Sequence, residues 1–427
     1  MMVVIYQTLK IIAQIGLKLF YPFKVQKSQK YFKTTGPLIL ISNHPNTLID
    51  PLFVASSFHR RLSFLANASL FKNRFLGLLL SLFYCIRIER KQDNGGQTVN
   101  NEKAFEQANR HLKAGGAIYI APEGTSIKGK KLLPFKTGTA RIAKSAFMGL
   151  DKGQDLHILP VGLTYRNPSF FGTEVAIMVG KPISIRKNWN LISSNGFEGI
   201  RKFTQLLEDT IKNLIIHCDS ENEEVLLDRL IEMESNSKKL EVGKWYVKAK
   251  RWSSVIKMLK EKSPEKFIDL NQKVEAYFTQ CKNWGVSDYA VAKKHQRGLI
   301  VSSIVLALGF PFFLVGLINH LIPVGLLVWI SRNYNKYVEY EATIQLVGGI
   351  ILAPFFYFLQ VKITSIFLVG NGPIYYLLMT VATGLLAIFY SRSLKKMEDR
   401  WAVAYNDITF LEQLRKQLVE GYLTAYK

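Results

Sequence analysis

The sequence predicts an α/β domain that is followed by a helical region and a C-terminal bundle of transmembrane helices. Between Phe32 and Arg186, short segments rich in Ile and Val alternate with helix-like stretches, a pattern typical of layered sheet-and-helix domains. From about Asn188 to Lys294 strand signals vanish and charge rises, and long apolar runs follow. The predicted parts are an amphipathic membrane-interface helix, the α/β domain, a helical region, transmembrane segments and an amphipathic helical tail, over residues 1–29, 30–187, 188–298, 299–391 and 392–427 respectively.

Strands and helices of the first domain follow from local patterns. Four apolar segments are predicted to be strands: residues 37–42, 116–121, 156–165 and 174–185. Several of them are apolar on both faces, which is typical of strands buried in a sheet with helical crossovers. Residues 98–116, which end in Gly, and residues 138–150 have the apolar spacing of helices.

The net charge of the chain favours an anionic partner. Among 427 residues, 56 are Lys or Arg and 32 are Asp or Glu, which gives a formal charge of +24 and a pI of about 9.7. Nucleic acid is not the expected partner, because basic and aromatic residues do not interleave on a recognisable module. The remaining class is a membrane surface with anionic lipids. Cys85, Cys218 and Cys281 lie far apart without metal-ligand spacing, which favours a reducing compartment.

Long apolar runs predict an integral membrane protein. Residues 299–330, 342–361 and 363–391 contain no Asp, Glu, Lys or Arg, and a spanning helix needs about 20 such residues. The alternative, a buried soluble core, would need three such runs inside one domain. The first run is too long for one span and too short for two, and Pro311 and Pro323 suit a bent or re-entrant hairpin.

Basic clusters predict that the α/β domain faces the cytoplasm. Lys and Arg concentrate at residues 293–297, at 332 and 336, and at 392–400, and the positive-inside rule favours the cytoplasm for all three clusters. This orientation leaves only Lys362 on the other side. At the N-terminus, Lys10 and Lys18 interrupt the apolar pattern, so an amphipathic helix in the membrane interface is expected, with packing against the chain's own core as the alternative.

Polar clusters follow predicted strands, where open α/β sheets place their sites. The first cluster, "SNHPNTLIDP", contains His44 and Asp50. A carboxylate that binds one ring nitrogen of a histidine lets the other nitrogen accept a proton from a hydroxyl. Because no Ser or Cys lies in a nucleophile-elbow motif, we expect direct attack by a substrate hydroxyl. A capped or core histidine is the structural alternative.

Two further clusters favour binding of an anionic group. Pro122 opens the turn "PEGTS", which contains Glu123, Gly124, Thr125 and Ser126 and offers hydroxyls, free amides and close backbone approach. Several lysines follow this turn. They either bind phosphate or form a solvated basic loop. Arg90 follows the alternating Ile86 and Ile88, and its guanidinium suits phosphate.

These clusters resemble those of the glycerolipid acyltransferase family, which includes lysophosphatidate and glycerol-3-phosphate acyltransferases. The resemblance covers roughly residues 30–185 and rests on four ordered blocks: "NHPNTLID", "CIRIERKQD", "APEGTSIKG" and "ILPVGLTY". It implies that His44 is the general base and Asp50 its orienting carboxylate. It also implies that Arg90, Glu123, Gly124 and Thr125 bind the acceptor phosphate, to which the turn reasoning adds Ser126.

The resemblance implies transfer of a fatty acyl group from acyl-CoA or acyl carrier protein to a hydroxyl of glycerol 3-phosphate or lysophosphatidate. The thioester is a co-substrate, and no metal or other cofactor is expected. Alternatives are a transacylase that uses a phospholipid donor and an inactive membrane scaffold.

The spacing within the first block departs from the family. Five residues separate His44 from Asp50, whereas the family usually has four. On a continuous helix, this separation would rotate the two side chains apart by about 140°. Pro45 is expected to start a helix directly after His44, which would leave the histidine on a loop. The spacing with "HPN" also resembles the branch of certain bacterial and fungal glycerol-3-phosphate acyltransferases.

Overall fold

The computed structural model divides the chain into two compact units. It describes residues 2–72, 74–82, 84–90, 99–194, 196–237, 244–294, 298–334 and 338–423. The first unit contains Met1–Asp219 and Tyr337–Leu346, and the second contains Ser220–Lys336 and Val347–Lys427. A short segment that begins an apolar helix therefore belongs to the first unit, although it lies far along the chain.

A mixed sheet forms the centre of the first unit and confirms the predicted α/β class. Its strands are β1 (Phe23–Lys27), β2 (Leu38–Ser42), β3 (Ser63–Asn67), β4 (Cys85–Ile88), β5 (Ala117–Ile120), β6 (His157–Tyr165), β7 (Glu174–Val179) and β8 (Ile183–Ser184). The order is β1-β7-β6-β2-β5-β3-β4, with β8 beside β6. Strands β6, β2, β5, β3 and β4 are parallel, and β7 and β8 run antiparallel to β6. The carboxyl ends of five strands therefore meet at one edge.

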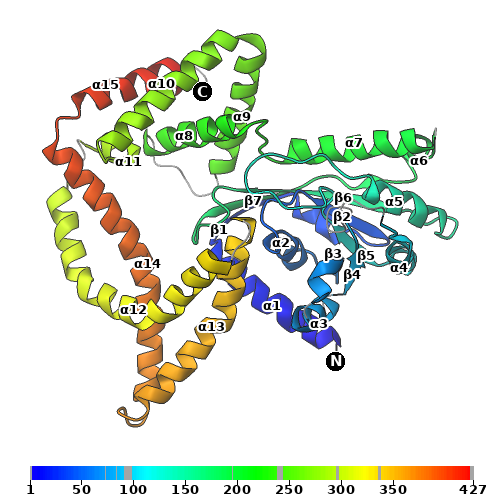
Figure 1. Cartoon of the computed structure of the whole chain (residues 1–427), viewed down its shortest axis with the longest axis horizontal. Helices are drawn as coiled ribbons and strands as arrows, with labels where there is room; N and C mark the ends of the chain where they lie inside the picture. The colour runs from blue at the N-terminus through cyan, green and yellow to red at the C-terminus, as the bar shows by residue number, and fades with distance from the viewer. Residues whose placement is uncertain are drawn as a thin grey trace. The chain divides into compact units, whose positions relative to one another are not determined.

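Helices cover both faces of this sheet (Figure 1). One face carries α4 (Glu102–Lys113), α5 (Gly138–Met148), α6 (Trp189–Ser193) and α7 (Phe197–Leu214), and the other carries α1 (Met2–Phe20), α2 (Ile49–Ser57) and α3 (Arg74–Leu82). Successive side chains of β2 point to opposite faces of the sheet, so this strand packs against both helix layers. Ile39 and Ile41 pack in the core with α4, α5 and α7, and Leu38 and Leu40 are buried as well.

The first unit differs from the sequence prediction at three strands. Phe23–Lys27 forms β1 inside the segment expected to be an interface helix, and Ser63–Asn67 forms the unpredicted β3. The expected strand at 174–185 is interrupted before β8, next to Pro182, which cannot donate a ladder hydrogen bond. Helix α1 buries Tyr6, Leu17 and Phe20. Its opposite face exposes Ile11, Ile15 and Leu19.

The second unit contains the predicted helical region. Its helices are α8 (Glu221–Ser237), α9 (Trp245–Lys262), α10 (Pro264–Asn283), α11 (Asp288–Ala292) and α15 (Thr409–Leu418). The buried carboxylate of Asp288 accepts hydrogen bonds from Arg415 Nε at 2.7 Å and from the Tyr277 hydroxyl at 2.8 Å. Because a buried carboxylate needs such donors, this group ties the C-terminal helix to the preceding helices.

Three described helices are long and apolar enough to span a membrane: α12 (Leu299–Tyr334), α13 (Glu341–Thr364) and α14 (Gly372–Tyr405). Helix α12 is continuous but changes direction along its length (Figure 1). It contains Pro311 and Pro323, each of which removes a backbone hydrogen bond and favours a bend. Helix α14 continues into the segment expected to be a separate tail, whose Leu, Lys, Met and Glu residues are good helix formers.

Candidate functional site

The loop after β2 brings His44 and Asp50 into contact. His44 Nδ1 lies 3.0 Å from Asp50 Oδ2, and the His44 side chain is 20% exposed whereas Asp50 is fully buried. The carboxylate can only accept, so Nδ1 carries the hydrogen. Nε2 is then unprotonated in the neutral ring. This is the geometry of an oriented general base.

An irregular turn, rather than an early helix, accommodates the long spacing. The expectation that Pro45 starts a helix is wrong, because α2 begins at Ile49. The backbone N–H of Asn46 donates to Asp50 Oδ2 at 2.7 Å, and Thr47 has a φ of 37°. Because Thr47 adopts this left-handed conformation, the turn accommodates the fifth residue between His44 and Asp50. Asp50, in the first turn of α2, can then face the histidine.

Tyr165 holds the other oxygen of Asp50. The Tyr165 hydroxyl donates to Asp50 Oδ1 at 2.6 Å. Burial and the nearby Asp50 carboxylate raise the pKa of Tyr165 well above its ordinary value, so the phenol keeps the proton that it donates. Sequence reasoning missed Tyr165. The signal was its position at the carboxyl end of β6, beside β2, where the rule that located His44 applies equally.

Glu123 fixes the backbone around the histidine. Its Oε1 accepts the backbone N–H of His44 at 2.6 Å, and its Oε2 accepts that of Leu133 at 2.9 Å. Burial raises the pKa of Glu123 to about 7, although these two donors favour the charged form. Both oxygens are thus engaged by the protein itself, and the side chain links the β2 loop to the loop after β5.

Arg90 and Lys136 place positive charge beside the turn after β5. Arg90 Nη1 donates to the Gly124 carbonyl at 2.8 Å. Gly124 has a φ of +71°, and a Cβ there would lie 2.8 Å from the Lys136 Nζ. The Lys136 side chain therefore covers the glycine, a placement that sequence reasoning left open among several lysines.

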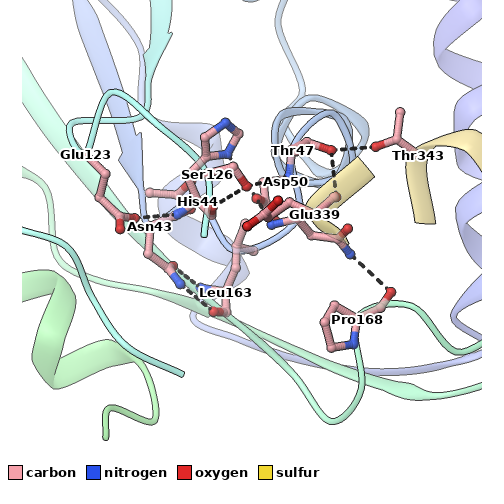
Figure 2. Close-up of polar contacts among 12 residues, drawn as sticks. Asn43, His44, Thr47, Asp50, Glu123, Ser126, Leu163, Pro168, Glu339 and Thr343 are labelled. Atoms are coloured by element: carbon pink, nitrogen blue, oxygen red, sulfur yellow. Dashed lines mark hydrogen bonds and ion pairs between the residues drawn. The ribbon is translucent and has the colours of Figure 1, made fainter. Parts of the chain in front are cut away.

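Ser126 lies in the turn after β5 and links it to the loop that carries His44 (Figure 2). Its hydroxyl donates to the His44 carbonyl at 2.8 Å and accepts the Thr47 N–H at 3.1 Å. Thr125 lies half-buried in this turn. The structure therefore brings His44, Asp50, Arg90, Glu123, Gly124, Thr125 and Ser126 to the carboxyl ends of β2, β4 and β5, as expected for parallel strands.

Comparisons with known proteins agree with the class of site. The acyltransferase family matches residues 24–164. A probable 1-acyl-sn-glycerol-3-phosphate acyltransferase of Mycoplasma genitalium is 33% identical over 117 residues, which are 26% of this chain and 41% of that protein. Glycerol-3-phosphate O-acyltransferase 2 of Saccharomyces cerevisiae is 30% identical over 89 residues, which are 21% of this chain and 12% of that protein.

One solved structure resembles part of the chain. The crystal structure of the 1-acyl-sn-glycerophosphate (LPA) acyltransferase from Thermotoga maritima matches with a TM-score of 0.36 and 19% sequence identity, over 48% of this chain and 79% of that chain. The chain spans about two fifths of the length of the first curated relatives it matches. Residues 24–164, which lie in the first unit, therefore match the acyltransferase family, and the curated relatives of this region are glycerolipid acyltransferases.

Proposed function

We propose that the protein is a membrane-bound O-acyltransferase that transfers a fatty acyl group from an acyl thioester to a hydroxyl of glycerol 3-phosphate or lysophosphatidate. The observation that carries this proposal is the His44–Asp50 pair, whose carboxylate also accepts hydrogen bonds from the Tyr165 hydroxyl and the Asn46 backbone. A carboxylate held in this way fixes the ring, and a fixed neutral imidazole is suited to deprotonate an alcohol.

The proposed reaction needs no covalent acyl-enzyme. His44 Nε2 takes the proton of the acceptor hydroxyl while the oxygen attacks the thioester carbonyl. When the tetrahedral intermediate collapses, the C–S bond breaks and the imidazolium returns its proton to the leaving thiolate. The products are an ester and a free thiol. General base catalysis of this kind contributes about 100- to 10,000-fold.

The acceptor phosphate is proposed to bind at the turn after β5. Arg90 and Lys136 lie at Gly124 and supply positive charge, and Thr125 supplies a hydroxyl. Glu123 is better suited to position the His44 loop than to contact phosphate, because both of its oxygens accept backbone N–H groups. Anchoring the phosphate orients the hydroxyl toward the base.

The proposed setting is a membrane, with the acyltransferase domain on the cytoplasmic side. Three described helices are long and apolar enough to cross a bilayer, and α1 exposes an apolar face. Membrane lipids are therefore the expected partners, and acyl-CoA or acyl carrier protein is the expected co-substrate, with no further cofactor. The charge of +24 would draw the protein toward anionic lipid.

The test is an acylation assay with the full chain in detergent micelles. Labelled palmitoyl-CoA or palmitoyl-acyl carrier protein is offered with glycerol 3-phosphate or lysophosphatidate, and labelled lipid is separated by chromatography. Wild type should acylate one of the acceptors, His44→Ala should lose at least about 100-fold, and the exposed-histidine control His59→Ala should remain active. Product only from a phospholipid donor would instead identify a transacylase, and no product from any donor would favour a scaffold.

A further inference from the structure

We propose that residues 338–346 are a positioning element of the acyl-transfer site; they comprise a short 3₁₀ helix (Val338–Tyr340) and the first residues of α13. This inference rests on the proposed function for its kinetic consequence. The segment belongs to the first compact unit, although the rest of α13 belongs to the second. It contacts both loops that build the site: the turn that carries His44 and the loop that follows β5.

The first contact is a hydroxyl relay at Thr47. Thr47 Oγ1 lies 2.6 Å from Thr343 Oγ1 and 3.2 Å from the carbonyl oxygen of Glu339 (Figure 2). A hydroxyl has one proton, so one arrangement satisfies both contacts: Thr343 donates to Thr47, and Thr47 donates to the Glu339 carbonyl. Thr47 is buried, and Thr343 is partly buried. Thr343 is therefore the donor that completes the relay.

The backbone conformation of Thr47 is strained. It is β-branched, and its φ of 37° is left-handed, a combination that costs about 1–3 kcal/mol and persists only where surroundings enforce it. Its backbone N–H donates to Ser126 Oγ, which in turn donates to the His44 carbonyl. The conformation of Thr47 is thus coupled through one side chain to the backbone of the histidine.

The second contact engages the loop after β5. Lys128 Nζ lies 3.5 Å from Glu341 Oε2, two residues beyond Ser126 in sequence. Both side chains are about one third exposed, so this ion pair adds little to the stability of the fold. Its main role is to hold Glu341 beside the loop after β5. Ala342 and Leu346, on the same segment, are buried, so apolar packing also holds the segment in place.

The consequence is that a helix outside the acyltransferase domain controls the geometry of the base. Loss of the Thr343 hydroxyl should loosen the turn between His44 and Asp50 without removing any group that contacts substrate. The effect should appear in kcat, because the base must reach the hydroxyl in the transition state, whereas KM should change little.

The kinetic experiment compares Thr343→Val, which keeps the shape and removes the hydroxyl, with Thr343→Ser, which keeps the hydroxyl. The matched control is Thr364→Val at the other end of α13, where the hydroxyl donates to a carbonyl of its own helix. Thr343→Val should lower kcat about tenfold. Thr343→Ser should lie within about twofold of wild type, since it retains the donor. Equal kcat for Thr343→Val and Thr364→Val would overturn the proposal.

Hydrogen exchange tests the same link without relying on activity. In full-length protein, Thr343→Val should accelerate amide exchange in the peptide covering residues 44–50, whereas Thr364→Val and Thr343→Ser should match wild type. Unchanged exchange in Thr343→Val would contradict the positioning role. If wild type transferred no acyl group, the proposed function would fail, and the exchange result would still decide whether this segment holds the turn.

Discussion

The hydroxyl of Tyr165 should govern how firmly Asp50 orients the histidine. Tyr165→Phe removes the donor at 2.6 Å and leaves Asp50 Oδ1 buried without it, which costs about 1–3 kcal/mol of stability. The carboxylate then has freedom to turn away from His44. We expect kcat to fall about tenfold while KM for the acceptor is retained, measured by steady-state acylation.

Tyr119→Phe is the matched control for this prediction. Tyr119 is also buried, and its hydroxyl lies 2.7 Å from Ser42 Oγ rather than from Asp50. It should therefore lower the melting temperature without a comparable loss of kcat. If both variants lost the same fraction of kcat, the effect of Tyr165 would be general destabilisation and not orientation of the carboxylate.

The pKa of Glu123 predicts a pH dependence of stability. Burial raises this pKa from 4.5 to about 7, so between pH 4.5 and pH 7 the folded protein binds more protons at Glu123 than the unfolded chain does. The contribution of this group to the unfolding free energy must therefore fall as the pH rises through that window, and it should change no further above it. The size of the effect is a few kcal/mol at most.

Thermal unfolding in detergent across this pH range measures the effect. Wild type should lose melting temperature with rising pH relative to Glu123→Gln, which cannot ionise, while the exposed-site control Glu106→Gln should parallel wild type. The amide introduced by Glu123→Gln presents an N–H₂ group where an acceptor is needed, so that variant should be less stable at every pH. Identical slopes for wild type and Glu123→Gln would contradict the raised pKa.

Gly124, in the turn after β5, is more tightly packed than Gly115, another glycine of the domain with a positive φ. Gly124→Ala places a Cβ at a φ of +71° and within 2.8 Å of the Lys136 side chain, so it must displace the lysine. Gly115→Ala meets the same backbone strain, with a φ of +75°, but no atom within 4 Å. Both variants should therefore lose similar stability from the backbone.

Only Gly124→Ala should affect binding of the phosphate-bearing acceptor. Displacement of Lys136, together with the Arg90 contact to the Gly124 carbonyl, should raise KM for that acceptor about tenfold, whereas Gly115→Ala should leave it unchanged. Steady-state kinetics with varied acceptor provides the comparison. An unchanged KM in Gly124→Ala would place the phosphate elsewhere.

Uninterrupted apolar patterns made the central strands predictable. Strands β2, β5 and β6 lie within a residue or two of their expected bounds, because each is rich in Ile, Leu, Val or Tyr and is buried on both faces. Strand β1 was missed because it carries Lys24 and Lys27. It lies at an edge of the sheet, paired only with β7, where charged side chains reach solvent.

The site was predictable where it depends on strand order along the chain and not where it depends on distant contacts. His44, Arg90 and Glu123 each follow a strand, so the carboxyl-end rule locates them. Thr343 reaches Thr47 across 296 positions of sequence, and no local pattern encodes such a contact. The left-handed Thr47 is likewise set by its surroundings and not by residue type.

Two side-chain contacts, one in each unit, restrict the number of times that the chain can cross a bilayer. In the first unit Thr47 contacts Thr343, so we expect the acyltransferase domain and the start of α13 on the same side of the membrane. In the second unit Lys294 Nζ lies 3.0 Å from Glu412 Oε2, so the segments before α12 and after α14 also share a side. Among the described residues between the domain and α13, only α12 is long and apolar enough to span. We therefore expect α12 to enter and leave the bilayer on the same side.

We therefore predict that α13 and α14 cross the bilayer as a pair while α12 is re-entrant, in agreement with the bend of α12 (Figure 1). Single cysteines test it in a background whose native cysteines are replaced. Val369→Cys lies between α13 and α14, at a position 95% exposed, and Phe170→Cys lies in the first unit at 63% exposed. With the basic clusters in the cytoplasm, an impermeant maleimide should label Val369→Cys in intact cells and Phe170→Cys only after permeabilisation. The reverse order would keep the crossing pair but invert the protein. Labelling of both under the same condition would show that α13 and α14 do not cross.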